Sequence, residues 1–516
     1  MVDNLFLLVK SLDKNEKGYF KKFAARYGEK STGNDYLKLF DLLDKADEYN
    51  EEPIKKHFAK GDKKFNLSAQ KNYLYAQLMR CLRSYHTANN TNYKLTENLL
   101  DVQNLMDKGL DDQAMDLIND SIRKAQQSYN ISMEYQFKAT KMSLMIRHIA
   151  KYPVEAIKAI KVEVKEVNEQ IQKGLVLEEM TYEMKVIFDE VISVGTLTAE
   201  IKAKADAVKN HPYFTEGLNW GYHSKGKIYT ALYLYSCIIS DDNDALKYLK
   251  LTNEMFKEIE LDTKVTSQYL ANISNIILIA LNMELMDEAE HQLHVLHSTR
   301  FKDPALEIYR QKLYSKNQLM YLTVISQQRK MEHAEVLDAE NNLLACNNPL
   351  IGNNNMMSCF YLSILFYVVG DRDKCLHWLE KTIAHENVSF MAVPAYARLL
   401  VALVHYEQNN LSLMESALNN TQYFIKKNNI VSDYLKQVIS YLSKLQHGLP
   451  KTEKQELLAD MLPWLEKVNQ ERRQEDFNYL LDFNLLIWCR ACLNKTTYAE
   501  ELRSNRLANM PETATA

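Results

Sequence analysis

Glycine and proline are scarce in this chain. Thirteen of its 516 residues are Gly and nine are Pro, whereas an average protein has roughly 7% Gly and 5% Pro. Nucleotide-binding α/β folds need glycine loops, β-sandwiches need frequent turns, and disordered chains are rich in both residues. The deficit therefore argues against all three classes.

Long apolar runs and a disulfide framework are also missing. The N-terminal apolar run Leu5–Val9 follows an acidic residue and is too short for a signal peptide. The most apolar internal segments, 273–283 and 361–369, fall far short of the ~18 residues that span a bilayer. Seven cysteines, an odd number spread between Cys81 and Cys492, fit reduced thiols. We expect a cytoplasmic protein without a membrane segment.

Charge is unevenly distributed along the sequence. Residues 1–94 contain 18 Lys and Arg and 12 Asp and Glu, a net charge of +6, whereas the whole chain has a net charge of −4. The remainder is therefore at −10. This asymmetry sets the first 94 residues apart from the rest of the chain.

A short phrase recurs from residue 109 onward: a turn, one or two acidic residues, a small residue and then an apolar helix. Successive small residues are 41 to 46 positions apart. They are Ala114, Ala156, Ala199, Ala245, Ala289, Ala334, Cys375, Ala417 and Ala459, and the phrase is weakest around Ala156, Ala199, Ala417 and Ala459. Each unit of about 43 residues holds two helical apolar patterns, so each unit is predicted to be an antiparallel helix pair.

Helix pairs that cannot bury an apolar face alone stack into a solenoid. The predicted fold is therefore all-α, an α-solenoid of stacked antiparallel helix pairs with a helical N-terminal module and a helical C-terminal cap. The predicted domains are the basic module 1–95, the solenoid 96–447, and the cap with a frayed tail 448–516.

The unit around Gly370 resembles the tetratricopeptide repeat. The positions that match that family's pattern are Leu362, Ser363, Phe366, Gly370, Asp371, Cys375, Leu379 and Thr382. Ile277 and Tyr233 stand where neighbouring units should have a small residue, and the period exceeds the 34 residues of that family. HEAT-type repeats, with a period of about 40–47 residues, are the alternative architecture.

The resemblance implies that the first helices of the units line a concave groove. In the unit around Gly370 the groove positions are Met357, Phe360, Tyr361, Ile364 and Tyr367; in the unit around Ala289 they include Leu278 and Asn282. For the large apolar residues, packing against a neighbouring unit is the alternative. The expected function is a non-enzymatic scaffold that binds a protein or peptide partner.

The basic N-terminal module supports a different class of function. Five lysines, Lys55, Lys56, Lys60, Lys63 and Lys64, precede a helix predicted over 69–86. A helix-turn-helix reader has a comparable arrangement, so the alternative is a regulator with a nucleic-acid-binding module and a peptide-sensing solenoid. Against it, Lys71 and Arg80 lie 180° apart on that helix, so they form no single stripe.

Three motifs resemble sites of chemistry. The segment 221–227 fits G-x-x-x-x-G-K but lacks the following Ser or Thr and a preceding strand, so it is interpreted as a turn. His291, His294 and His297 spread over 120° of a helix and are interpreted as a solvated face. Cys489 and Cys492 are interpreted as core thiols within a helix. No catalytic residue, cofactor or metal is expected.

Overall fold

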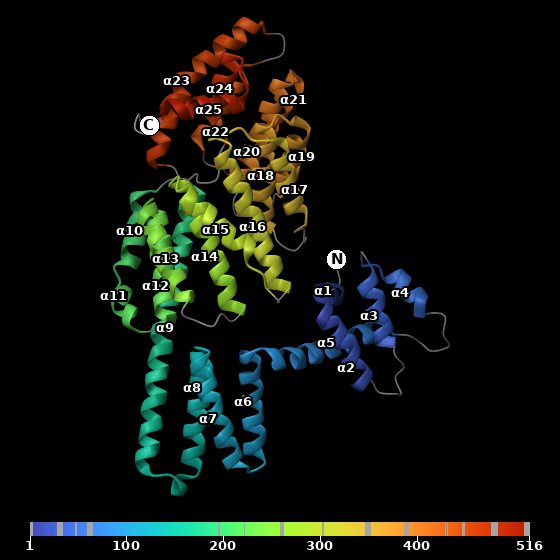
Figure 1. The fold of residues 1–516 in the computed structure, drawn as a ribbon, viewed down its shortest axis with the longest axis vertical. Helices are drawn as coiled ribbons and strands as arrows, with labels where there is room; N and C mark the ends of the chain where they lie inside the picture. Colours follow the sequence, from blue (N-terminus) through green and yellow to red (C-terminus); the bar gives the residue numbers. More distant parts are fainter. Residues whose placement is uncertain are drawn as a thin grey trace. The chain divides into compact units, whose positions relative to one another are not determined.

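The computed structural model describes residues 4–27, 35–46, 49–58, 66–194, 197–220, 222–257, 263–301, 304–345, 352–385, 392–428, 430, 432–445, 449–475 and 483–509. Every regular element in these ranges is a helix (Figure 1). None of the described helices is long and apolar enough to cross a membrane. The all-α prediction is confirmed for this part of the chain.

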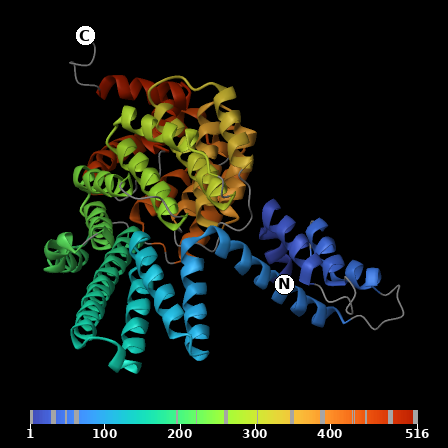
Figure 2. The ribbon, with the colours of Figure 1, turned by 60° about the horizontal axis from the view of Figure 1, so that its bottom comes forward.

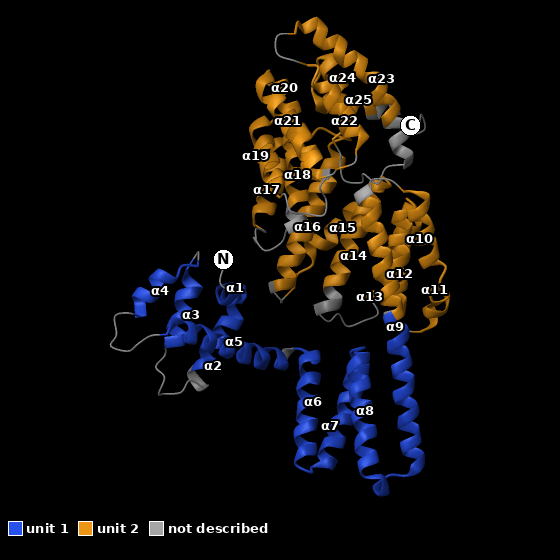
Figure 3. Ribbon diagram, turned by 180° about the vertical axis from the view of Figure 1, so that it is seen from behind, with its two compact units in different colours: residues 1–175 blue, residues 176–516 orange. Residues whose placement is uncertain are grey.

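The chain divides into two compact units, residues 1–175 and 176–516 (Figure 3). The sequence analysis predicts three domains, with boundaries at residues 95 and 447. This division into two units does not test those boundaries, which stay predictions.

The first unit begins with five helices. They are α1 (Asn4–Ser11), α2 (Lys14–Tyr27), α3 (Asp35–Lys45), α4 (Glu51–Phe58) and α5 (Leu67–Asn89). Helix α5 packs against α2 and α3. Phe20, Phe40, Leu74 and Leu78, all fully buried, form the centre of this group.

The rest of the first unit consists of α6 (Thr91–Asp107), α7 (Asp111–Gln127), α8 (Ile131–Arg147), the short 3₁₀ helix η1 (Ile149–Lys151) and the start of α9 (Val154–Val194). Helices α6, α7 and α8 pack in sequence (Figure 2). Asn90 starts α6 by accepting hydrogen bonds from the backbone N–H groups of Asn92 and Tyr93. The buried Lys138 of α8 pairs with Glu163 of α9 at 3.1 Å.

The second unit contains the remaining helices. They are α10 (Ala199–Lys209), α11 (Tyr213–Glu216), η2 (Gly217–Asn219), α12 (Tyr222–Ile238), α13 (Asp242–Lys257), α14 (Thr263–Asn282), α15 (Met286–Ser298), α16 (Pro304–Ile325), α17 (His333–Ala345), α18 (Gly352–Val368), α19 (Arg372–Ile383), α20 (Ala392–Glu407), α21 (Leu411–Lys427), α22 (Asp433–Leu442), α23 (Lys451–Glu475), α24 (Leu485–Asn494) and α25 (Tyr498–Asn509). Consecutive helices pack against one another as pairs, notably α12 with α13, α14 with α15, α18 with α19 and α20 with α21. The first helices also contact each other, α14 with α16, α16 with α18 and α18 with α20.

One type of turn joins the two helices of five pairs. A residue with positive φ ends the first helix in each; these are Gly109, Ser240, Glu284, Gly370 and Asn409. In the Gly370 turn, Gly370 N–H donates to Tyr367 O at 3.1 Å and Asp371 N–H donates to Phe366 O at 2.9 Å. This hydrogen-bond pattern is a Schellman motif, which satisfies the last carbonyls of the first helix and reverses the chain within three residues.

The predicted small residue follows four of these turns. Ala114, Ala245, Ala289 and Cys375 are each the fourth residue of a second helix, respectively α7, α13, α15 and α19, and each is fully buried. A side chain no larger than a thiol lets the two helices of a pair approach closely at that point. The sequence pattern therefore located a buried small residue near the start of the second helix in these four pairs.

At the other marker residues, the even spacing does not identify a buried small residue near the start of a second helix. The single helix α9 runs through the region in which one predicted unit ends and the next begins, since no proline or turn sequence interrupts residues 154–194. Ala199, Ala334 and Ala459 are exposed, and Ala156 and Ala417 are only partly buried, so none of these five marks a close crossing. In α21 the fully packed fourth residue is Met414.

Candidate functional site

The five groove positions predicted in α18 are buried. Met357 is 8% exposed, and Phe360, Tyr361, Ile364 and Tyr367 are each 1% exposed. They belong to the large apolar core of the second unit, with α16, α17, α19 and α20 packed around their helix. A partner could contact them only after a neighbouring helix moves, so their role in a groove stays a prediction.

Tyr367 is held by charged and aromatic groups. Its hydroxyl donates to Glu407 Oε1, and the Arg372 guanidinium lies over its ring at 3.8 Å from the centroid. Arg372 Nε donates to Glu407 Oε2 at 2.9 Å. Burial, followed by the nearby Glu407 carboxylate, raises the pKa of Tyr367 well above its usual value.

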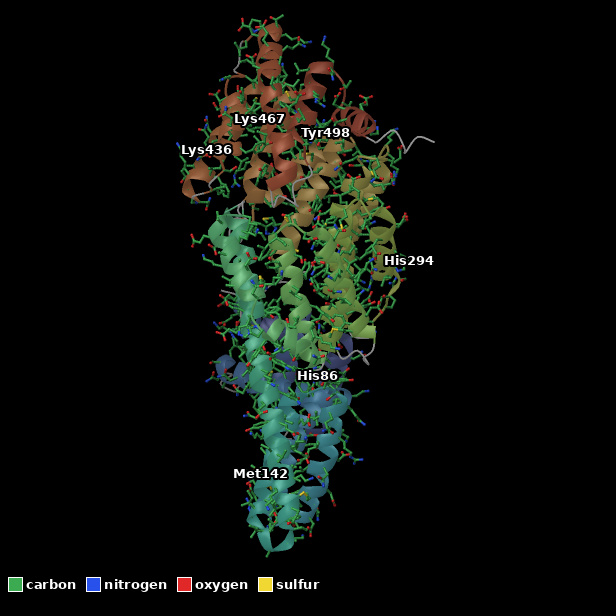
Figure 4. All side chains as sticks on the ribbon, turned by 90° about the vertical axis from the view of Figure 1, so that its left-hand side faces the viewer. His86, Met142, His294, Lys436, Lys467 and Tyr498 are labelled. Carbon is green, nitrogen blue, oxygen red and sulfur yellow. The ribbon has the colours of Figure 1, made fainter. Side chains whose placement is uncertain are left out.

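The C-terminal helices complete the surroundings of Tyr367. Trp488 Nε1 of α24 donates to Glu407 Oε1 at 3.1 Å. The rings of Phe483 and Tyr498 lie 5.1 Å and 5.4 Å from the Tyr367 ring, centroid to centroid. Tyr498 begins α25 and is labelled in Figure 4. This end of α18 is therefore covered by the chain itself.

Leu278 and Asn282, the two groove positions predicted in α14, are partly exposed. Ala271 and Asn275 share their side of the helix, because positions four and seven residues apart lie nearly one above the other. The α14 residues that pack with α15, such as Ile273 and Ala280, lie on the opposite side. The side-chain nitrogen of Asn282 is buried and has no hydrogen-bond partner within the described part of the chain.

The neighbouring helix α16 is aligned with α14 by a buried hydrogen bond. Asn317 Nδ2 donates to Ser274 Oγ at 2.8 Å, and the two residues are 43 positions apart, the length of one predicted unit. Lys316 is turned about 100° from Asn317 and about 200° from Gln318, whose side chain contacts Asn342 of α17. Lys316 therefore points away from the second helix of its own pair, as Leu278 does in α14.

Tyr309, Lys312 and Lys316 form one stripe of α16, and each is partly exposed. Burial lowers the pKa of Lys316 and raises the pKa of Tyr309. Among the described residues, no carboxylate pairs with Lys316. We call this stripe, together with Asn275, Leu278 and Asn282, the α14–α16 face. Its partly exposed polar residues include Asn275 and Lys316, and none of its residues is acidic.

The predicted nucleic-acid contacts fall partly within the described structure. Lys55 and Lys56 are exposed in α4, whereas Lys60, Lys63 and Lys64 lie outside the described residues. Lys55 Nζ is 3.1 Å from Glu51 Oε2. Hydrogen bonds from Tyr49, Lys55 and Lys71 lower the pKa of Glu51 to about 2, so this carboxylate offsets part of the local positive charge.

The three histidines of α15 are exposed, and His294 is labelled in Figure 4. No cluster of three or more His, Cys, Asp or Glu side chains within the described ranges is arranged to hold a metal ion. Cys489 is fully buried, its Sγ donates to Leu458 O at 3.3 Å, and burial raises its pKa to about 12. Residues 222–227 of the glycine-containing motif belong to α12 and form a helix where a turn was expected.

No protein-family model matches this sequence, and no curated protein matches it. The site is therefore defined by its own geometry.

Sequence reasoning found Leu278 and Asn282 but missed the three α16 residues of the face. A signal was present, since Tyr309, Lys312 and Lys316 recur at helical spacing on a helix whose other side is apolar. Groove positions were predicted only in the units around Gly370 and Ala289, so none was assigned to the unit around Ala334, whose marker residue is exposed.

Proposed function

We propose that this protein is a non-enzymatic helical-repeat scaffold that binds an acidic segment of a protein or peptide partner at the α14–α16 face. The observation that carries the proposal is the partly exposed Lys316, whose ammonium group has no carboxylate partner within the described residues. A carboxylate of a partner would pair with it.

The repeat architecture supports the same function. We propose a tetratricopeptide-like solenoid, because the first helices contact one another in series and four second helices carry a buried small residue at their fourth position. In such an array, side chains on successive first helices form one extended surface. An extended acidic segment crossing α14 and α16 would meet Asn275, Leu278 and Lys316.

The proposal is tested by fluorescence anisotropy with labelled peptides rich in Asp and Glu, each compared with an Asn and Gln version. The account predicts saturable binding of the acidic peptides that weakens as salt is raised. Lys316→Glu should weaken binding by roughly tenfold or more, because it places a like charge against the ligand. The matched control is Lys330→Glu, an exposed lysine beyond the end of α16. Equal binding of the neutral peptides, or equal losses in both variants, would exclude the assignment.

The basic module is the basis of a second proposal, binding of DNA or RNA by residues 1–95. Its support is the +6 charge of residues 1–94 and the exposure of Lys55 and Lys56 at the end of α4. Non-specific nucleic-acid affinity should fall steeply with salt. Replacing both lysines with Gln should reduce that salt dependence, whereas Lys316→Glu should leave it unchanged.

A further inference from the structure

Helix α5 contains no acidic residue, although it is 23 residues long and carries three basic ones. One of these, Lys71, pairs with Glu51 at 3.3 Å. Arg80 and Arg83 are exposed, and no carboxylate within the described residues pairs with either. The two arginines lie 60° apart around the helix, so the solvent side of α5 carries two adjacent guanidinium groups.

Two exposed tyrosines flank these arginines. Tyr75 of α5 is 47% exposed, and Tyr93, in the first turn of α6, is 46% exposed. Counted at 100° per residue, Tyr75, Arg83 and His86 lie within about 80° of one another around α5. The His86 ring, labelled in Figure 4, is 5.2 Å from the Tyr93 ring, centroid to centroid. We call the surface formed by Tyr75, Arg80, Arg83, His86 and Tyr93 the α5–α6 face.

The aromatic end of this face is held in place from below. Glu16 of α2, whose side chain is only 15% exposed, lies 3.2 Å from His86 Nε2 and fixes the imidazole ring. The Tyr93 ring covers that imidazole at an angle of 32° between the planes. An aromatic base can therefore stack on the side of Tyr93 that faces away from His86. The carboxylate one turn further along α6, Glu97, pairs with Lys94 at 2.6 Å.

We propose that the α5–α6 face binds a single-stranded nucleic acid. One base stacks on Tyr93 and another on Tyr75. Arg80 and Arg83 pair with the phosphates of the same strand. The proposal rests on the one above, that residues 1–95 bind DNA or RNA, and it adds the surface and the form of the ligand.

The dimensions and the chemistry of the face suit a strand with unpaired bases. Tyr75 and His86 are 11 residues apart, about 16 Å along α5, so several nucleotides of an extended strand connect the two stacking positions. Every base has a π-face that can stack on a tyrosine, and a guanidinium pairs with phosphate whatever the sequence or the sugar. The bases of a duplex stack on one another, so a duplex would use only the arginines.

The test is fluorescence anisotropy on the full-length protein with labelled oligo(dT) and oligo(U) strands of about 12 nucleotides, and with a DNA duplex of the same length. The proposal predicts that the two strands bind with similar affinity, and about tenfold or more tightly than the duplex at the same salt concentration.

Equal or tighter binding of the duplex would overturn this proposal and leave nucleic-acid binding by residues 1–95 standing. The absence of binding to all three probes would overturn both. Displacement of the strands by an equal charge of polyglutamate would also exclude the single-strand assignment, because a chain without bases cannot stack.

Variants of Tyr93 isolate the stacking. Tyr93→Ala should weaken strand binding roughly tenfold, because a base loses the ring on which it stacks. Tyr93→Phe keeps the ring and should bind like the wild type. Leu100→Ala, at a position of α6 that is 65% exposed, is the control and should have no effect. Unchanged affinity in Tyr93→Ala, or equal losses in Tyr93→Ala and Tyr93→Phe, would contradict the proposal.

A variant of Arg83 isolates the charge. Arg83→Gln should lower the slope of log affinity against log salt by about 0.7, the value for one phosphate contact on a single strand. Lys158→Gln, at an exposed position of α9, should leave the slope unchanged. Both side chains are exposed, so both variants should keep the wild-type melting temperature. An unchanged slope in Arg83→Gln would remove this arginine from the binding surface and contradict the proposal.

Discussion

Individual carboxylates connect helices that are distant in the sequence. Glu407 of α20 accepts from Tyr367 of α18, from Arg372 of α19 and from Trp488 of α24. Each of those donors would lose its acceptor if the carboxylate were removed. The sequence showed only a polar residue near the end of a helical pattern, and nothing in its spacing indicated three partners.

Removing this acceptor should destabilise the second unit. Glu407→Ala is expected to lower the free energy of unfolding by about 2–3 kcal/mol, because a buried tyrosine and a buried indole lose their hydrogen-bond acceptor. Glu415→Ala, an exposed position on α21, is the control and should change it by less than about 0.5 kcal/mol. Urea unfolding measures both, and equal effects would mean that the network does not stabilise the fold.

The ion pair of Glu335 predicts a pH dependence. Hydrogen bonds from Arg329 lower the pKa of Glu335 to about 2. Because the folded pKa lies below the ordinary glutamate value, the stabilisation is present above about pH 4.5 and is lost as the pH falls toward 2. The pair is partly exposed, so solvent screening limits the effect to about 1 kcal/mol.

The measurement for this pair compares wild type and Glu335→Gln in urea at several pH values. The difference in unfolding free energy should be largest near pH 6 and should shrink below pH 4.5. A difference that is constant from pH 6 to pH 3 would contradict the assignment.

At the scale of elements, the turns between paired helices limit which residues the chain tolerates. Gly370 has φ of +84°, and no heavy atom lies within 4 Å of the position a Cβ would take. Its substitution by Ala should therefore cost only the backbone strain, about 1–2 kcal/mol. Glu284 occupies the equivalent position at φ of +56°. Glu284→Gly should be neutral or stabilising by up to about 1 kcal/mol, and calorimetric melting would show the opposite signs.

The buried small residues give a second prediction for the elements. Ala289→Ile should cost about 1–3 kcal/mol, because the side chain is fully buried where α14 and α15 approach. Ala334→Ile provides a matched control, since Ala334 occupies the same place in the repeat pattern but is exposed. If both variants melt alike, the close-crossing explanation is wrong.

These two alanines also show how far the sequence predicts the elements. The repeat spacing identified both alanine positions. A sequence pattern cannot distinguish a buried alanine from an exposed one, so it did not show which of the two is buried. The pattern was informative where a Schellman turn preceded the small residue, as at Ala289. It failed in α9, where no proline interrupts the sequence and one helix runs from Val154 to Val194 through the expected turn.

At the scale of the whole molecule, repeat spacing predicted helix pairs packed in series but not the division of the chain at residue 175. It also predicted groove positions in two units without distinguishing a covered helix from an accessible one. Helix α18 is buried on all sides from Met356 to Val368, and one of the helices that cover it, α25, follows it by more than 100 residues. Helix α14 keeps a polar stripe, and there the predicted positions Leu278 and Asn282 remain partly exposed.

The central claim is that a partner binds the α14–α16 face, and site-specific photocrosslinking in native lysate tests it most directly. A benzophenone amino acid is placed at position 278 in one protein and at position 413 in another; Leu413 is an exposed leucine on the second helix α21. The account predicts a crosslinked partner from position 278 that disappears when Lys316→Glu is added, and no such product from position 413. Equal crosslinking from both positions, or a product from position 278 that survives Lys316→Glu, would contradict it.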